Sequence, residues 1–133
     1  MDLVVTGDLS IQGAAGGLVA SALDVSQRGH ASGGGPGGGQ SSRHGASYGG
    51  AGGSAQDGSA LPIVYGSLDT PIDLGSSGGR FGNLGGAGGG AVRLTVLGTL
   101  AVDGSILANG QSAQHTGGSG GSVWVTAGEL TGM

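Results

Sequence analysis

A phrase of eleven residues with two-residue alternation occurs twice in the chain, at a constant offset of 91 positions. The two copies read LVVTGDLSIQG, at residues 3–13, and LTVLGTLAVDG, at residues 94–104. Six apolar or glycine positions of one parity match: Leu3 with Leu94, Val5 with Val96, Gly7 with Gly98, Leu9 with Leu100, Ile11 with Val102, and Gly13 with Gly104. Such alternation is typical of strands with one buried face, and the glycines mark corners between strands. The chain is therefore predicted to contain a structural repeat made of strands.

Two weaker echoes of the phrase lie at residues 18–29 and 123–133. Apolar residues never recur at three-and-four spacing for more than one turn, so no helix is predicted. The strand-like regions are accordingly expected at residues 2–28, 91–108 and 122–133.

Glycine separates these regions. It supplies 36 of the 133 residues, and the richest insertions are residues 29–60, 75–90 and 110–121. A collagen triple helix is excluded because glycine keeps no strict period of three. Two interpretations of the insertions stay open. They are either disordered loops or ordered, polyproline-II-like or polyglycine-II-like segments that pack side by side through Cα–H to carbonyl contacts.

Period-two phrases with glycine corners that recur along a chain point to a parallel β-solenoid. The fold prediction is therefore an all-β chain, with one parallel β-solenoid (β-helix) module over residues 1–133 and glycine-rich insertions on one flank. A β-sandwich is the alternative, but an Asn-Gly hairpin signal occurs once only, at Asn109-Gly110.

Charge and composition exclude several classes of function. The net charge is −4, lysine is absent and only four residues are arginine, so nucleic-acid binding is not expected. No apolar run approaches the ~20 residues that span a bilayer. Without cysteine there is neither a disulfide nor a thiolate metal site. The first residues lack a secretion signal, and the last stop inside an alternating pattern, so we expect a piece of a larger protein or a subunit whose ends are covered by neighbours.

Four longer phrases resemble a known family. They are GASYGGAGG (45–53), YGSLDTPIDLGSSGG (65–79), GGGAVRLTVLGTLAVDGSILANG (88–110) and GGSGGSVWVTAGELTG (117–132). In this order they resemble the repeated glycine-rich modules of very large surface proteins of microbial eukaryotes and some bacteria. The resemblance covers residues 18–133. It implies a parallel β-helix protein of the cell surface or extracellular matrix, with no catalytic residue to carry over.

Several short sequences resemble catalytic or nucleotide-binding motifs, and they occur because glycine is abundant. G-x-S-x-G occurs at Ser47, Ser77 and Ser119, but none precedes the helix that a nucleophile elbow requires. The G-x-G-x-x-G match at Gly33, Gly35 and Gly38 lies in no βαβ unit. A P-loop is excluded by the absence of lysine.

Candidate acidic and histidine sites are equally weak. Residues 52–60, with Asp57, half-match a calcium nonapeptide. Asp69 and Asp73 flank Pro71, a pattern that indicates a turn more than a carboxylate pair. No metal-ligand spacing joins the three histidines, His30, His44 and His115. Neither catalysis, a cofactor nor a metal is therefore predicted.

The residues expected at interfaces or in packing are large apolar and aromatic side chains: Trp124, Tyr48, Tyr65, Phe81, Leu3, Val5, Val123 and Val125. If Val123 and Val125 face inward, Trp124 faces outward, where it packs against protein or binds a sugar ring.

The functional expectation is a structural, self-associating subunit of an extracellular filament or cell-surface coat. It would form a homo-oligomer or filament by end-to-end or lateral stacking, because a short stack of strands leaves two open ends. A glycan-binding surface module, or adhesin, is the alternative. A polysaccharide-degrading β-helix enzyme is a remote one.

Overall fold

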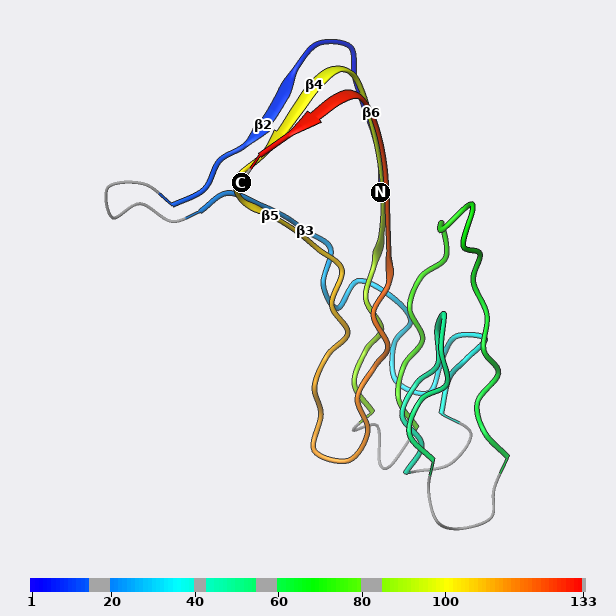
Figure 1. Ribbon diagram of the computed structural model, residues 1–133. Helices are drawn as coiled ribbons and strands as arrows, with labels where there is room; N and C mark the ends of the chain where they lie inside the picture. Colours follow the sequence, from blue (N-terminus) through cyan, green and yellow to red (C-terminus); the bar gives the residue numbers. More distant parts are fainter. Residues whose placement is uncertain (15–19, 40–42, 55–59, 80–84, 133) are drawn as a thin grey trace.

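The computed structural model describes residues 1–14, 20–39, 43–54, 60–79 and 85–132. Within these residues the chain forms six strands and no helix (Figure 1). The strands are β1 (Asp2–Val5), β2 (Leu9–Ile11), β3 (Ala22–Asp24), β4 (Ala91–Val102), β5 (Ser105–Leu107) and β6 (Ser122–Thr131).

The longest strand, β4, lies at the centre of a four-stranded sheet. On one side, β1 and β2 pair with its first and second halves, so that Leu3 lies opposite Leu94 and Leu9 opposite Leu100. On the other side, β6 follows β4 along its length and places Val125 opposite Leu94. Every one of these pairings is parallel. The two copies of the repeated phrase are thus hydrogen-bonded neighbours, paired at the same offset of 91 positions that relates them in the sequence.

A second, two-stranded sheet joins β3 to β5 in parallel, with Leu23 opposite Ile106. It follows the bend at Gly104, where a Cβ atom would lie 2.2 Å from the carbonyl oxygen of Ser21. Only glycine fits at this bend, as its place between two alternating runs indicates.

The core follows the alternation of β4. Val92, Leu94, Val96 and Leu100 are buried, whereas Arg93 and Leu97 between them are exposed. Half-buried apolar residues of the neighbouring strands pack on this row: Val5, Leu9, Val102, Ile106, Val125 and Ala127. The predicted division into a buried and an outward set of residues is confirmed for β4.

The predicted parallel β-solenoid is wrong. Within the described residues the strands form two small sheets, one of four strands and one of two, and no solenoid. In the described parts of the glycine-rich insertions there is a single isolated bridge, between Gly85 and Thr116, and no strand. The physical reason is that glycine has a low strand propensity and no side chain for cross-strand packing. Ladders therefore form where apolar alternation exists and stop where glycine begins.

The described glycine-rich residues pack against one another below the sheets (Figure 1). Backbone hydrogen bonds join segments that are distant in sequence: Gly29 N–H donates to the Gly88 carbonyl, Gly75 N–H to Gly89, and Gly89 N–H to Ser119. The backbones approach so closely that a Cβ at Gly88 would lie 1.9 Å from the carbonyl oxygen of Gly75. Close approach of backbones is what the absence of a side chain permits.

Buried hydroxyl groups connect these glycine segments. Ser76 and Ser77 are fully buried, and their Oγ atoms accept hydrogen bonds from the backbone N–H groups of Gly37 (3.0 Å) and Gly33 (2.8 Å). Ser119 Oγ accepts from the N–H of Ser76 at 2.8 Å. Buried backbone groups need such partners where no strand ladder supplies them.

Candidate functional site

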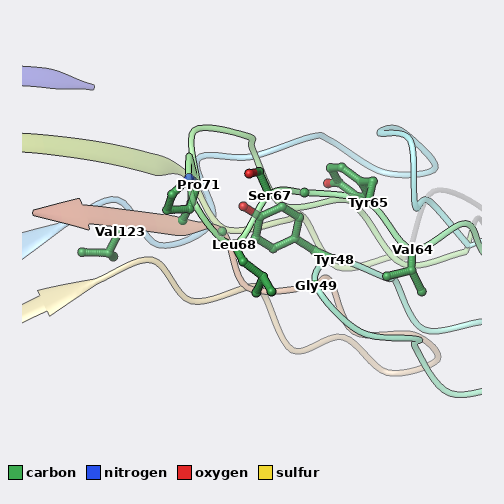
Figure 2. Close-up of a pocket in the computed structure, with 11 residues that line it drawn as sticks. Tyr48, Gly49, Val64, Tyr65, Ser67, Leu68, Pro71 and Val123 are labelled. Atoms are coloured by element: carbon green, nitrogen blue, oxygen red, sulfur yellow. The ribbon is translucent and has the colours of Figure 1, made fainter.

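An open pocket of about 460 Å³ lies beside the start of β6 (Figure 2). We call it the tyrosine pocket and define it by six of its lining residues: Tyr48, Tyr65, Leu68, Pro71, Ser122 and Val123. Figure 2 shows the two tyrosine rings near Ser67 and Leu68, with Pro71 and Val123 towards β6. Most of its wall is apolar, so the pocket suits an apolar or aromatic group of a ligand.

Tyr48 and Tyr65 pack edge to face, with ring centroids 5.0 Å apart and an interplanar angle of 63°. Gly66 makes room for this pair. Its φ is +100°, and a Cβ at this position would lie 2.7 Å from Cε2 of Tyr48. Both the left-handed conformation and the contact with the ring require glycine.

The hydroxyl group of Tyr65 is anchored to the glycine-rich part of the molecule. It donates to the carbonyl oxygen of Leu74 (2.5 Å) and hydrogen-bonds with Ser76 Oγ (2.7 Å). Partial burial raises the pKa of Tyr65 above its ordinary value, against the opposing effect of the hydrogen bond with Ser76. The two hydrogen bonds of its hydroxyl group hold the Tyr65 ring in one orientation at the wall of the pocket.

The segment 67–74 supplies the outer rim of the pocket through Ser67, Leu68 and Pro71. Ser67 Oγ accepts from the backbone N–H groups of Asp69 (3.3 Å) and Thr70 (3.1 Å), which closes a serine-based turn. Asp69 and Asp73 are both exposed, and the rim is fixed to β6 because Ser122 Oγ donates to the carbonyl oxygen of Asp73 at 2.7 Å. The sequence pattern around Pro71 favours a turn made by Asp and Pro, whereas the group that closes the observed turn is the hydroxyl of Ser67.

Among the residues that the structure describes, apolar residues at both edges of the four-stranded sheet have a strand partner on one side only. Leu3 of β1 is 37% exposed, whereas Leu94, its partner on β4, is 0% exposed. Leu130 of β6 is 67% exposed beside Leu100, which is fully buried. The predicted residues Val5 and Val125 are half-buried and pack on the core, and Val123 is exposed.

Trp124 lies on the outward face of the sheet, opposite Arg93 in the register of β4 and β6. The guanidinium of Arg93 lies 4.7 Å from the centroid of the tryptophan ring. This geometry is a cation–π contact, typically worth about 0.5–1 kcal/mol at an exposed position. The half-buried indole therefore packs within the chain on the side where Arg93 lies.

The remaining candidates have structural environments. Ser47 and Ser77 are fully buried, and their Oγ atoms accept from Gly52 N–H (3.0 Å) and Gly33 N–H (2.8 Å). His44 is buried, His30 is half-buried and His115 is exposed. Among the residues that the structure describes, no three His, Asp or Glu side chains gather in a group that could hold a metal ion. Phe81 and Asp57 lie outside the described residues.

Sequence reasoning missed the rim of the pocket and its neighbours. Leu68 is almost fully exposed, and Ile63, Val64 and Ile72 are exposed as well. Ile72 lies beside Met1 at the opposite edge of the sheet, where both line a second hollow of about 310 Å³. The available signal was the apolar composition of LPIVYGSLDTPIDL (61–74), which has neither period-two nor helical spacing.

No helix long and apolar enough to cross a membrane occurs in the described ranges. Comparisons with protein-family models, with curated proteins and with solved structures find no match to this chain.

Proposed function

We propose that this chain is a structural, non-catalytic subunit that associates with copies of itself to form an extracellular filament or a cell-surface coat. The observation that carries the proposal is the pair of open edges on the central sheet. Strand β1 pairs with β4 on one edge and strand β6 pairs with β4 on the other, both in parallel. Each edge therefore retains backbone groups that a further strand can pair with.

The two edges are different surfaces, and this determines what kind of assembly they support. A contact of β6 with β1 of another copy is heterologous, so each added copy presents a new free edge. Such an interface grows into an open-ended filament rather than closing as a two-fold dimer. Continued pairing of this kind gives a fibre whose strands are hydrogen-bonded across subunit boundaries.

The glycine-rich part of the molecule supports a structural role. Its described segments are held by backbone hydrogen bonds and by buried serine hydroxyls, as at Gly29, Gly75 and Ser76. Ordering this much glycine costs conformational entropy, because glycine loses more freedom on folding than any other residue. Neighbouring subunits that cover the sheet edges offset part of this cost. The extracellular location rests on the resemblance to glycine-rich surface proteins.

Glycan binding is the second candidate, and the tyrosine pocket is the observation that favours it. Two tyrosine rings and Pro71 line an open, mostly apolar hollow of about 460 Å³. Aromatic side chains with polar tips suit ligands that have an apolar face and hydroxyl groups. A glycan bound there would contact Tyr48 and Leu68 from the solvent side.

Electron microscopy and sedimentation velocity of the purified 133-residue chain test the first candidate. We expect filaments with a regular subunit repeat, and a sedimentation coefficient that rises with protein concentration. The second candidate would be supported by a different set of results. The protein would sediment as a monomer at every concentration, bind glycans on an array, and lose this binding in Tyr48→Ala. A monomer with no glycan binding contradicts both.

A further inference from the structure

The two free edges of the sheet carry matching residues in a matching order. Leu3 on β1, Leu94 on β4 and Val125 on β6 form one row across the sheet. Met1 begins a second row, because its carbonyl oxygen accepts from Arg93 N–H and its amino group donates to the Ala91 carbonyl, which puts it opposite Val92. Val92 in turn lies opposite Val123.

We infer that β6 of one copy pairs in parallel with β1 of the next copy, with Val125 opposite Leu3 and Val123 opposite Met1. In this junction Met1 of the added copy lies beside Val123, at the wall of the tyrosine pocket of the preceding copy. The inference rests on the proposed self-association and specifies its partner, its polarity and its register.

The backbone geometry supports this register. In a parallel pair, alternate residues of a strand direct both backbone groups to the same neighbour. Arg93 N–H donates to Met1 and Ser122 N–H donates to Gly90, so Asp2 and Val4 on β1, and Val123 and Val125 on β6, direct their groups to the free edges. Pairing Val125 with Leu3 aligns these donors and acceptors and keeps side chains of the same face together. A shift by one residue would place apolar side chains on opposite faces.

The side chains at the two ends of a row are more exposed than the one between them, which indicates that each end lacks a neighbouring strand. Met1 is 55% exposed and Val123 39%, whereas Val92 between them is 1% exposed. In the inferred junction Met1 and Val123 acquire the neighbour that Val92 already has on both sides. Removing these aliphatic side chains from water favours the junction, because burial of apolar surface is the main driving force of association.

The tyrosine pocket lies where the next copy would place its first residue. It is lined by Gly121, Ser122 and Val123 of the β6 edge and by no residue of β4. At the other edge, Met1 and Ile72 line the second hollow beside the start of β4.

Charges favour one part of the junction and oppose another. Asp2 of the added copy lies opposite Trp124, whose ring contacts the cationic Arg93. Glu129, which pairs with Thr99, lies near Asp8 of the added copy, because Asp8 is the residue that contacts Thr99 from the β1 side. The like charges of Glu129 and Asp8 weaken the contact, so Glu129→Gln is expected to lower the protein concentration needed for assembly at least several-fold.

Cysteine cross-linking tests the register directly, because the chain contains no cysteine. Within one chain, positions 3 and 125 are two strands apart, about 9–10 Å, beyond disulfide reach. Across the inferred junction they are adjacent, at about 4.8 Å. We therefore expect a mixture of Leu3→Cys and Val125→Cys to give a covalent dimer on mild oxidation, and neither variant alone to do so.

Matched controls separate the register from association itself. Leu3→Cys mixed with Ala127→Cys should not cross-link, because a two-residue offset puts the Cα atoms about 8 Å apart. The mixed pair Leu9→Cys and Leu130→Cys should cross-link, because the register shift of β4 and β6 between Val96 and Thr99 puts Leu130, like Leu9, opposite Leu100, and the junction is expected to keep this shift. Far-UV circular dichroism of each variant checks that it folds like the parent.

Three results would overturn the inference. Assembly with cross-links in Leu3→Cys alone indicates a head-to-head contact, and assembly with cross-links only in the Ala127→Cys mixture indicates another register. Assembly in which neither the 3–125 nor the 9–130 mixture cross-links indicates an interface elsewhere. All three leave the proposed self-association intact. A chain that remains monomeric contradicts both the junction and the proposed function.

Discussion

Single glycines hold the tyrosine pocket in shape, and the chain offers a matched pair to measure this. Gly49 and Gly66 both have positive φ, at 62° and 100°, but only Gly66 has a neighbour where a Cβ would be. Gly49→Ala therefore measures the left-handed conformation alone, at about 1–2 kcal/mol. Gly66→Ala adds the collision with Tyr48, and we expect about 1–3 kcal/mol of further destabilisation.

Chemical denaturation of the two variants beside the parent protein gives these values. Near-ultraviolet circular dichroism should also change in Gly66→Ala, because Tyr48 must move away from Tyr65. Equal destabilisation of both variants would mean that the position of the Tyr48 ring does not depend on the absence of a Cβ at residue 66.

The hydroxyl of Tyr65 makes stability depend on pH in the alkaline range. Its pKa is raised in the folded chain, so folding favours the neutral phenol. The contribution is fully present below pH 10, the ordinary tyrosine value, and is lost as the pH rises through the raised pKa. We expect the free energy of unfolding to fall above about pH 10, and to fall less in Tyr65→Phe.

The titration itself can be followed in Tyr48→Phe, in which Tyr65 is the one remaining tyrosine. Tyrosinate absorbance in the folded variant should have its midpoint above the midpoint measured in denaturant. A folded midpoint at or below the denatured one contradicts the role of burial at this hydroxyl.

At the scale of elements, the glycine segment that leads into β6 is held by backbone contact. A Cβ at Gly121 would lie 1.8 Å from the carbonyl oxygen of Gly90, whereas the nearest atom to a Cβ at Gly120 is 3.8 Å away. Neither residue has a positive φ. We expect Gly121→Ala to destabilise the chain by about 3 kcal/mol through overpacking, and Gly120→Ala to be neutral or stabilising by about 0.5 kcal/mol.

Thermal and urea denaturation of the two neighbouring variants measure this difference. If Gly120→Ala and Gly121→Ala behave alike, the packed glycine layer does not contribute to stability in solution. A loss confined to Gly121→Ala would show that adjacent glycines have unequal roles.

Elements differ in how well the sequence predicts them. The repeated phrase predicts strands where β1, β2 and β4 lie. The structure adds that the two copies pair at the same offset of 91, as Leu3 with Leu94 and Leu9 with Leu100. The rim of the pocket could not be predicted in this way. Leu68, Ile72 and Pro71 follow no period, and their positions depend on contacts with β6 and with the start of β1.

At the scale of the whole molecule, assembly should depend on the backbone of the β1 edge. Val4 directs its N–H to the free edge, and proline is tolerated in edge strands at such positions. Leu3, before it, is already extended, as the residue preceding proline must be. We expect Val4→Pro to remain folded and to lose filament formation, because a ring replaces the donor that the next strand would use.

The control is Leu97→Gln, at a position whose exposure, 63%, matches the 62% of Val4 but which lies on the central strand β4. It should assemble like the parent protein in electron microscopy and sedimentation. Filaments that persist in Val4→Pro, or that disappear in Leu97→Gln, would exclude pairing at the β1 edge.

Local alternation and glycine content were sufficient to predict an all-strand chain, the buried face of β4 and the presence of a repeated strand phrase. These properties depend on residues near one another in sequence and on a two-residue period, which a sequence displays directly. Two sheets in place of a solenoid, the close packing of glycine backbones and the pocket between Tyr48, Leu68 and Val123 depend on long-range contacts. Glycine has no side chain and restricts its backbone little, so its sequence leaves the path open until hydrogen bonds and van der Waals contacts with distant segments select one.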